Sequence, residues 1–391
     1  MREAVVLALN SGSSSLKFGL YRVVKDDIRC LLAGEAEKIG DATARFHVED
    51  GQGRMLHHEA VAMADQQAAM LRIAQFLSAS HALSPSAIGH RIVHGGPHLR
   101  KHVVIDAAVL TQLEAATAFA PLHAPAALAA IRFAGEHFPG LPQAACLDTQ
   151  FHARMPLIAS TLPLPAALGD AGLQRYGFHG LSCESIVRQL GPTLPARLLI
   201  AHLGNGASIT AVQDGVSLDT SMGLTPSGGL IMGTRSGDLD PGVLVHLMRE
   251  MSMDATAVEQ LVDHCSGLLG ISGLSADMRA LHAAADANSA AQLAIEMFCY
   301  AAAKQIGAMS TVLNGVDMLV FTGGIGEHDA VVRAAICARL ACLGVELGEA
   351  RNGLAAGTIS RVGSRCEVQV LPSKEDEQIA RHTAALCQVA S

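Results

Sequence analysis

Short apolar runs alternate with segments of helical periodicity from one end of the chain to the other. Near the N-terminus, the apolar run 4–9 is followed by the small polar residues 10–17 and by a second apolar run, 18–21. Two such runs joined by a turn of glycine, serine and asparagine predict a β-hairpin. Residues 1–50 read as strands and turns, and apolar positions at helical spacing predict a helix over 60–83.

The same alternation continues through the rest of the chain. Buried strands are predicted at 88–93 and at 144–147, and the second of these ends at Asp148. Prolines mark two connectors, 120–125 and 155–166, and we expect the second to pass between domains. Strands that alternate with helices place the chain in the α/β class. The helical segments expected are 107–119, 126–138, 243–262, 289–313, 330–340 and 380–389.

Two more glycine turns follow later in the chain, and the first of them repeats the hairpin design. Strand patterns at 198–203 and 207–212 flank the Gly-Asn-Gly turn at 204–206, which predicts a second hairpin. A third apolar run leads into Thr-Gly-Gly-Ile-Gly-Glu (322–327), ahead of a helical segment. None of the three turns is a Walker A loop, and the last is no dinucleotide fingerprint because Asp329 stands where the third glycine belongs. The pattern predicts a duplicated domain that binds a nucleotide in the cleft between its halves.

The first turn has the chemistry of a phosphate site. Its small residues leave backbone N–H groups open to a ligand, and Lys17 adds a full positive charge. An ordinary polar hairpin has the same composition, so this segment alone leaves both interpretations open.

Length and composition narrow the function classes. A chain of 391 residues predicts two domains of roughly 150–200 residues each. A net charge of −8, 3% aromatic residues and no Lys/Arg run argue against nucleic-acid binding. No stretch of about 20 apolar residues avoids charge or proline, so no membrane span is expected. The nine cysteines are scattered, odd in number and without Cys-x-x-Cys, which favours reduced thiols and a cytoplasmic location.

Four side chains are candidates for chemistry. Arg91 ends a strand beside a glycine turn, and Arg235 lies in the glycine-rich segment 219–242, a candidate lid. An arginine carries a planar charged fork suited to carboxylate or phosphate, although most arginines form surface ion pairs. Asp148 follows a buried strand, where α/β proteins place ligand chemistry, and it could instead cap the next element. His179 lies between an aromatic residue and a glycine, where a purely structural histidine is also common.

Two other clusters favour structural interpretations on local grounds. Glu375 belongs to an acidic cluster of the kind that starts a solvated helix. Histidines recur every four residues at positions 90, 94, 98 and 102. The intervening Gly-Gly-Pro would interrupt the helix needed to align them, so we reject a metal site there.

Through six short motifs, which occur in the family's order, the chain resembles the acetokinase family of the acetate-and-sugar-kinase/heat-shock-chaperone/actin superfamily. The resemblance covers essentially the whole chain. The resemblance implies a duplicated ribonuclease-H-like (actin-like ATPase) α/β fold of two domains, with the active site in the inter-domain cleft. It implies a carboxylate- and phosphate-side domain at 1–147 plus 377–391, and a nucleotide-binding and dimerisation domain at 148–376. The motifs are Asn-Ser-Gly-Ser-Ser-Ser-x-Lys (10–17), Gly-His-Arg-Ile-Val-His-Gly-Gly (89–96), Arg-Tyr-Gly-Phe-His-Gly (175–180), His-Leu-Gly-Asn-Gly (202–206), Gly-Thr-Arg-Ser-Gly-Asp-Leu-Asp-Pro (233–241) and Thr-Gly-Gly-Ile-Gly-Glu (322–327).

The resemblance also implies an activity and its residues. The expected reaction is reversible transfer of the ATP γ-phosphoryl group to acetate, with Mg²⁺ or Mn²⁺, in a homodimer. Asn10 and Glu375 would hold the metal, and Lys17 would reach nucleotide phosphate. The catalytic residues implied are Arg91, Asp148, His179 and Arg235; those of the acetate pocket are Arg91, Val93, Leu122, Phe178 and Pro226; those of the ATP segments are His202, Leu203, Gly204, Asn205, Gly206, Asp277, Met278, Arg279, Gly324, Ile325, Gly326, Glu327 and His328.

The chain departs from the family pattern at three motifs. His-Ala-Pro (123–125) replaces His-Asn-Pro, Gly-Glu-His (326–328) replaces Gly-Glu-Asn, and Ser-Lys-Glu-Asp (373–376) replaces Thr-Asn-Glu-Glu. The last departure bears on the metal, because Lys374 would compete with an ion at Glu375 unless it points away.

Two alternative functions stay open. A propionate or butyrate kinase of the same family differs only in the acid, and one methylene discriminates by only about 10–200-fold, even with Val93 narrowing the pocket. A non-catalytic, ATP-driven switch on the same fold would need an added peptide-binding or polymerising segment, and we expect none.

Overall fold

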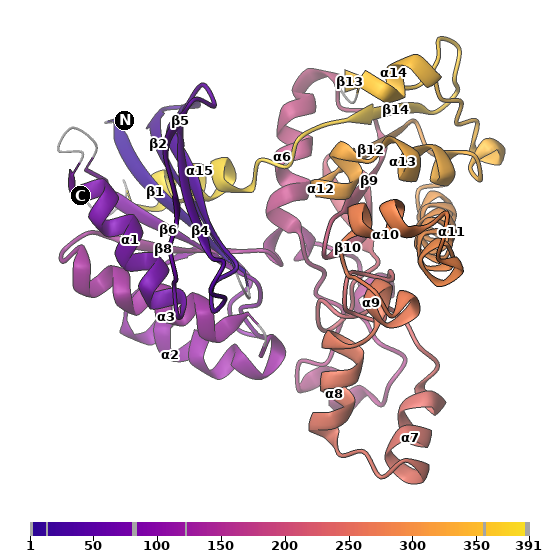
Figure 1. Cartoon of the computed structure of the whole chain (residues 1–391), viewed down its shortest axis with the longest axis horizontal. Coiled ribbons are helices and arrows are strands. Elements are labelled where there is room, and N and C mark those ends of the chain that lie inside the picture. Colours follow the sequence, from indigo (N-terminus) through magenta and orange to yellow (C-terminus); the bar gives the residue numbers. More distant parts are fainter. Residues whose placement is uncertain (1–2, 13–14, 80–83, 122, 355–356, 388–391) are drawn as a thin grey trace. The chain divides into compact units, whose positions relative to one another are not determined.

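The computed structural model describes residues 3–12, 15–79, 84–121, 123–354 and 357–387, which form two compact units (Figure 1). Unit 1 comprises residues 1–153 and 374–391, and unit 2 comprises residues 154–373. The boundaries predicted after residues 147 and 376 therefore fall after 153 and 373 in the structure, which places Asp148 in unit 1. Leu122 lies outside the described residues.

Unit 1 is built on an eight-stranded sheet in the order β5-β4-β3-β2-β1-β6-β8-β7. The expected hairpin forms: β1 pairs antiparallel with β2, with Asn10 opposite Lys17. Strands β6 and β8 continue the sheet in parallel with β1. The strands are β1 (Ala4–Ser11), β2 (Leu16–Val24), β3 (Asp27–Glu37), β4 (Arg45–Asp50), β5 (Met55–Ala60), β6 (Ala87–Ile92), β7 (Val103–Val104) and β8 (Gln143–Leu147).

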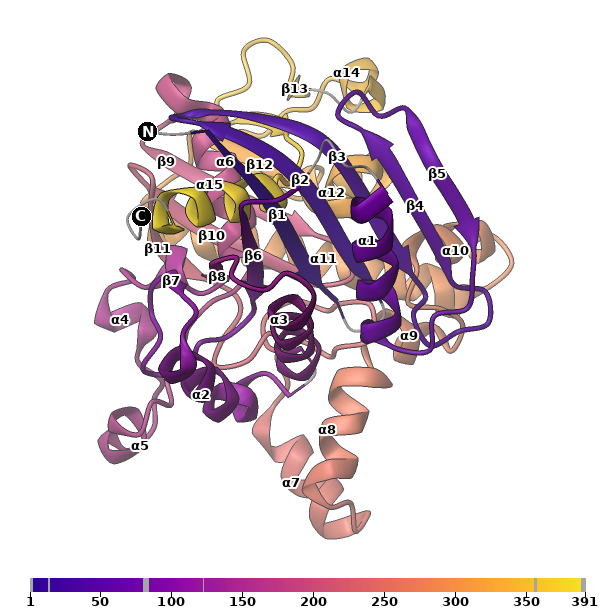
Figure 2. The same cartoon turned by 90° about the vertical axis from the view of Figure 1, so that its left-hand side faces the viewer.

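Helices cover both faces of this sheet. On one face, α1 (Gln66–Ala79) and α3 (Ala124–His137) lie side by side, as Figure 2 shows, and pack on a core that includes Ile88. On the other face, the C-terminal helix α15 (Glu375–Cys387) lies on β1, β6 and β8. A Cβ at Gly89 would come within 2.2 Å of the Thr383 hydroxyl oxygen, so only glycine lets α15 approach this closely. The 3₁₀ turn η1 (Ala116–Phe119) follows α2 (Ala107–Ala115), and η2 (Gln150–His152) follows β8.

Unit 2 has a six-stranded sheet in the order β11-β10-β9-β12-β14-β13. The predicted hairpin of β9 and β10 is confirmed, and β12 joins β9 to β14 through parallel pairing. The long helix α11 (Ser289–Val312) contacts β9, β10 and β11, and α6 (Gly180–Leu190) packs on β9. The strands are β9 (Arg197–Leu203), β10 (Ala207–Gln213), β11 (Val216–Thr220), β12 (Met318–Thr322), β13 (Gly357–Thr358) and β14 (Glu367–Val370).

The remaining elements of unit 2 are short. They are α4 (Leu157–Ser160), α5 (Ala166–Asp170), η3 (Gly191–Thr193), α7 (Pro241–Glu250), α8 (Ala255–His264), α9 (Gly267–Ser272), α10 (Met278–Ala284), α12 (Gly323–His328), α13 (Ala330–Cys337), η4 (Ala341–Leu343) and α14 (Glu349–Leu354). Among the described residues, no helix is long and apolar enough to cross a membrane.

The two sheets share one topology. In each, a three-stranded antiparallel meander is followed by two parallel strands and a short antiparallel edge strand: β3-β2-β1-β6-β8-β7 in unit 1 and β11-β10-β9-β12-β14-β13 in unit 2. Strands β4 and β5 are additions to the first sheet. The predicted duplication in an α/β fold is therefore confirmed, and the turn after β1 corresponds to the turn after β9.

Several predicted elements are wrong in detail. The helix expected from residue 60 begins at Gln66, and residue 60 is instead the last residue of β5. Both faces of β5 are largely exposed, so apolar and polar residues alternate only weakly along this strand. The segment 243–262 holds two helices, since Asp254 caps a new helix. The loop expected at 155–166 contains the single turn α4. The last helix starts at Glu375 rather than at residue 380.

Candidate functional site

A cluster of charged side chains gathers where the parallel strands of unit 1 end. Asn10 is the penultimate residue of β1, Arg91 is the penultimate residue of β6, and Asp148 directly follows β8. Glu375 is the first residue of α15. Carboxyl ends of parallel strands are where open α/β sheets bind ligands, and the topology brings these four predicted residues together although they are far apart in sequence.

Arg91 is the centre of this cluster. Its Nε and Nη2 atoms donate to Oδ2 of Asp148 at 3.0 and 2.5 Å, and its Nη1 atom donates to Oδ1 of Asn10 at 3.0 Å. The same Nη1 lies 3.8 Å from Oε2 of Glu375. Asp148 is fully buried, whereas the Arg91 side chain keeps 17% of its surface exposed. The arginine is thus held in one orientation with part of its charge accessible to a ligand.

The charges explain the pKa of Arg91. Burial by itself would lower the pKa, but the carboxylates of Asp148 and Glu375 raise it, and the net shift is upward. The Arg91 guanidinium therefore stays charged at neutral pH.

Asp376 joins this cluster, although the sequence did not single it out. Asn10 donates through Nδ2 to Oε2 of Glu375 at 3.0 Å and to Oδ1 of Asp376 at 3.3 Å. Burial, and then repulsion from Glu375, raise the pKa of Asp376 to about 6, against the opposing effects of Asn10, Lys17 and Arg91. The signal for this residue was its place beside Glu375 in the acidic start of a helix, a pattern shared by many solvated helices.

The charge of Lys374 is engaged by a carboxylate other than those of Glu375 and Asp376. Its Nζ atom forms an ion pair with Oε1 of Glu377, one turn into α15, at 3.2 Å. This ion pair reduces the competition that we expected from the sequence between Lys374 and a cation at Glu375.

In unit 2, two histidines stack at the end of the first strand. His202 is the penultimate residue of β9, the position that Asn10 holds in β1. Its ring lies 4.1 Å from that of His179, with 22° between the planes. Serines fix both rings: Nδ1 of His179 is 2.9 Å from Oγ of Ser208, and Nδ1 of His202 is 2.8 Å from Oγ of Ser182. These serines are positioning residues that sequence motifs did not reveal.

His179 sits on an unusual backbone. It precedes α6 with φ +56° and ψ +26°, the left-handed region, which costs a non-glycine residue of order 1 kcal/mol or more. The side chain is 7% exposed. Backbone strain of this kind at a non-glycine residue is typical of functional sites.

Arg235 approaches the same turn from the glycine-rich loop. A Cβ at Gly206 would lie 3.1 Å from Nε2 of His179 and 3.6 Å from Nη2 of Arg235, so both side chains converge on this glycine. Nη1 of Arg235 donates to the carbonyl of Pro226 at 2.6 Å. The loop itself is fastened to the hairpin by a hydrogen bond from the Gly233 N–H to the Asn205 carbonyl, 3.0 Å long.

The segments expected to bind ATP also come together in unit 2. The turn of β9 and β10 neighbours α12, because a Cβ at Gly204 would lie 3.7 Å from the Gly324 nitrogen. Leu203 is fully buried and Met278 is 3% exposed, so neither side chain is open to a nucleotide. Asp277 caps α10 and pairs with Arg279, whose side chain is 90% exposed.

Three of the residues predicted for the acetate pocket are buried within their own units. Val93 belongs to unit 1 and is 7% exposed. Phe178 and Pro226 belong to unit 2, and both are buried.

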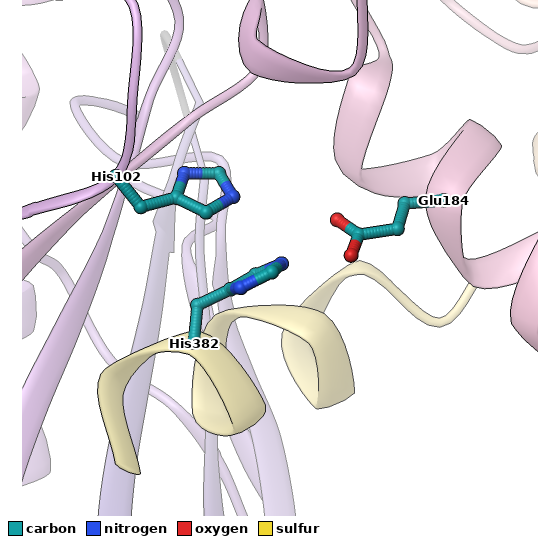
Figure 3. A group of neighbouring side chains, drawn as sticks. All are labelled: His102, Glu184 and His382. Carbon is teal, nitrogen blue, oxygen red and sulfur yellow. The ribbon is translucent and has the colours of Figure 1, made fainter. Parts of the chain in front are cut away.

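The recurring histidines lie on no common helix, because His90 belongs to β6, which ends at Ile92, and the chain then passes through a turn. His102 instead contacts His382 of α15, with ring centres 4.0 Å apart (Figure 3). Burial, and then His382, lower the pKa of His102 to about 3, and its Nδ1 accepts the Leu147 N–H at 2.9 Å. His102 is therefore neutral near pH 7, and it holds Leu147, the last residue of β8, next to Asp148. The third side chain labelled in Figure 3, Glu184, belongs to unit 2.

Comparison with known proteins gives a consistent result. Residues 5–381 match the acetokinase family. Proteins named acetate kinase from Methylocella silvestris and Rhodopseudomonas palustris are 42% and 41% identical, each over 97% of both chains. The structure of a propionate kinase from Francisella tularensis superimposes with a TM-score of 0.90 at 37% identity, over 98% of this chain and all of the other. Porphyromonas gingivalis acetate kinase gives a TM-score of 0.85 at 35% identity, over 98% and 99%.

Proposed function

Because the chain belongs to the acetokinase family, we propose that it catalyses reversible transfer of the γ-phosphoryl group of ATP to acetate, giving acetyl phosphate and ADP. The observation that best supports this reaction is the fixed guanidinium of Arg91. It is held among carboxylates at the strand ends, yet it is partly exposed. A permanent planar charge of this kind suits a carboxylate substrate.

The reaction needs charge cancellation more than it needs a base. Acetate is an anion at neutral pH and can attack phosphorus directly, but it must approach a polyanionic phosphate. Positive charge and hydrogen-bond donors for the phosphoryl group during transfer would come from Arg91, Arg235 and His179. Asp148 accepts two hydrogen bonds from Arg91 and therefore orients that arginine.

Oxygen ligands for Mg²⁺ are present in unit 1. Glu375 and Asp376 present carboxylate oxygens, which this hard cation prefers, and the amide oxygen of Asn10 accepts a hydrogen bond from Arg91 beside them. Burial first, and then repulsion from Glu375, raise the pKa of Asp376, and a divalent cation would relieve the repulsion. Glu375 and Asn10 would hold the ion, which when bound neutralises charge on the nucleotide phosphates.

The nucleotide is assigned to unit 2 by the segments around the β9–β10 turn and α12. Gly324 of α12 has open space where a Cβ would stand, so a phosphate can approach the backbone there, and Lys17 is the side chain we expect to reach nucleotide phosphate. All nine cysteines are free thiols, which supports a cytoplasmic location.

Propionate is a second candidate substrate, favoured by the likeness to the Francisella propionate kinase structure. Initial rates with acetate, propionate and butyrate, each with MgATP, distinguish the candidates. We expect the largest kcat/KM with acetate. A larger value with propionate would reassign the substrate, and no acyl phosphate from any of the three acids would reject the reaction.

A homodimer is proposed from exposed apolar side chains of unit 2. Leu293, Met297 and Tyr300 lie at i, i+4 and i+7 on α11 and are 50%, 38% and 56% exposed. Helix α7 has no buried residue among its ten, and it exposes Val243 and Met248. Apolar helix faces of this kind mark protein interfaces, and a second copy of the chain would cover them.

A further inference from the structure

The geometry points to Glu327 as a positioning residue that fastens the nucleotide turn α12 to the chain segment carrying Glu375. One carboxylate oxygen, Oε1, accepts two backbone hydrogen bonds. One comes from the Gly323 N–H at the start of α12, and the other comes from the Ser373 N–H; both are 2.9 Å long. Glu375 follows Ser373 by two residues. The inference rests on the proposed assignment of ATP to α12 and of Mg²⁺ to Glu375.

The start of α12 is a conformation that needs support. Gly323 has φ +78°, and a Cβ there would lie 2.8 Å from the Leu203 carbonyl oxygen. Since the first N–H groups of a helix lack partners within it, the Glu327 carboxylate fulfils this need at Gly323 and also complements the helix dipole.

The other end of α12 is held just as firmly. Arg333, which is fully buried, donates through Nη1 to the carbonyls of Gly326 and Glu327, both at 2.9 Å. Its Nε and Nη2 atoms bind the side chain and the carbonyl of Asn352. Both ends of α12 are therefore anchored. Because Glu327 also accepts the Ser373 N–H, the position of α12 determines the position of Ser373.

Ser373 makes a second contact that reaches the stacked histidines. Its hydroxyl donates to Oγ of Ser182 at 3.0 Å, and that oxygen lies 2.8 Å from Nδ1 of His202. The residue before it is also fixed, because Gln189 donates to the Pro372 carbonyl at 2.9 Å. The last residues of unit 2 are therefore tied to α12, to α6 and to β9 before the chain continues to Glu375.

The test separates geometry from charge at one position. Glu327→Gln keeps an oxygen where Oε1 lies and removes the charge, whereas Glu327→Asp keeps the charge and withdraws the oxygen. Loss of a group that orients ligands typically costs 10–100-fold in affinity or activity. We expect Glu327→Asp to raise the Kd for MgADP and the KM for ATP at least tenfold, and to raise the Mg²⁺ concentration for half-maximal rate. Glu327→Gln should raise these values less than Glu327→Asp does, and the KM for acetate should change less than twofold in both.

Calorimetric titration with MgADP provides a readout that needs no turnover. An inactive wild-type enzyme would thus reject the proposed reaction, while the MgADP affinities would still decide the role of Glu327. Glu349→Ala, which removes an exposed carboxylate of the same unit, is the matched control and should bind MgADP as the wild type does. If Glu327→Asp binds MgADP normally, or if Glu327→Gln loses as much affinity as Glu327→Asp, the positioning role is wrong.

Discussion

Replacing Arg91 by alanine should damage stability and activity for different reasons. The change leaves the carboxylate of Asp148, which is fully buried, without the two guanidinium hydrogen bonds it accepts. Breaking a buried ion pair by removing one partner costs about 3–5 kcal/mol, because the remaining charge stays desolvated. The same change removes a fixed positive charge from the proposed phosphoryl-transfer site, and losing one such group lowers kcat by about 10²–10³.

A double variant separates the two effects. In Arg91→Ala/Asp148→Ala, the buried carboxylate of Asp148 is removed together with the guanidinium, so most of the lost unfolding free energy should return. Activity should not return, since the guanidinium is still missing. Urea denaturation monitored by circular dichroism gives the unfolding free energies, and acetyl phosphate formation from acetate and MgATP gives kcat.

Arg22→Ala is the matched control in unit 1. Arg22 pairs with Glu3 on the surface, where both side chains are about half exposed, and such pairs contribute about 0–1 kcal/mol. This variant should keep its stability and turnover. A folded Arg91→Ala protein with near-normal kcat would refute the assignment of Arg91. A double variant no more stable than Arg91→Ala would refute the account of Asp148.

Four further outcomes are expected. Arg235→Ala should lower kcat by about 10²–10³ with little change in unfolding free energy, measured by the same two assays. His179→Gln should keep at least tenfold more kcat than His179→Ala if the ring acts by hydrogen bonding, since both variants carry the same left-handed backbone cost; equal losses would indicate a charged imidazolium. Burial and repulsion from Glu375 raise the pKa of Asp376 to about 6, so its ionised form destabilises the fold above that pH, and the cost disappears as the pH falls from about 6 to 4. Asp376→Asn should therefore raise the unfolding free energy by about 1–3 kcal/mol at pH 8 in EDTA and by progressively less below pH 6; a pH-independent effect would exclude this explanation. Light scattering should show a dimer at micromolar concentration that Tyr300→Asp weakens, whereas a monomeric wild type would contradict the homodimer.

The local patterns of the sequence predicted the strands and their turns well. Both hairpins and the strand–glycine–helix turn at 318–328 form, because glycine turns between apolar runs specify them without help from distant residues. The start of α1 and the break between α7 and α8 were missed, since exposed strands and helix caps leave weak periodic signals. The fold was predicted as a duplicated α/β protein, and the matching strand orders of the two sheets confirm it.

The candidate site was predicted in its members but not in its connections. Motif resemblance named Arg91, Asp148 and Glu375, and the structure brings them together with Asn10. The motifs gave no sign that Glu327 accepts hydrogen bonds from two backbone groups, or that Ser208 and Ser182 fix the stacked histidines. Such roles depend on which side chains meet across the fold, and spacing along the chain does not record them.

The return of α15 to the first sheet has a consequence for how the protein is made. Unit 1 begins to emerge from the ribosome first, yet the helix that fills the space over Gly89 lies beyond residue 373. The sheet of unit 1 therefore cannot be covered by α15 until all of unit 2 has been synthesised. Contacts this distant in sequence slow folding and prolong the exposure of apolar surface. The nascent chain should therefore depend on chaperones late in synthesis, and losing the last turns of α15 should harm unit 1 more than an equal deletion from an exposed loop.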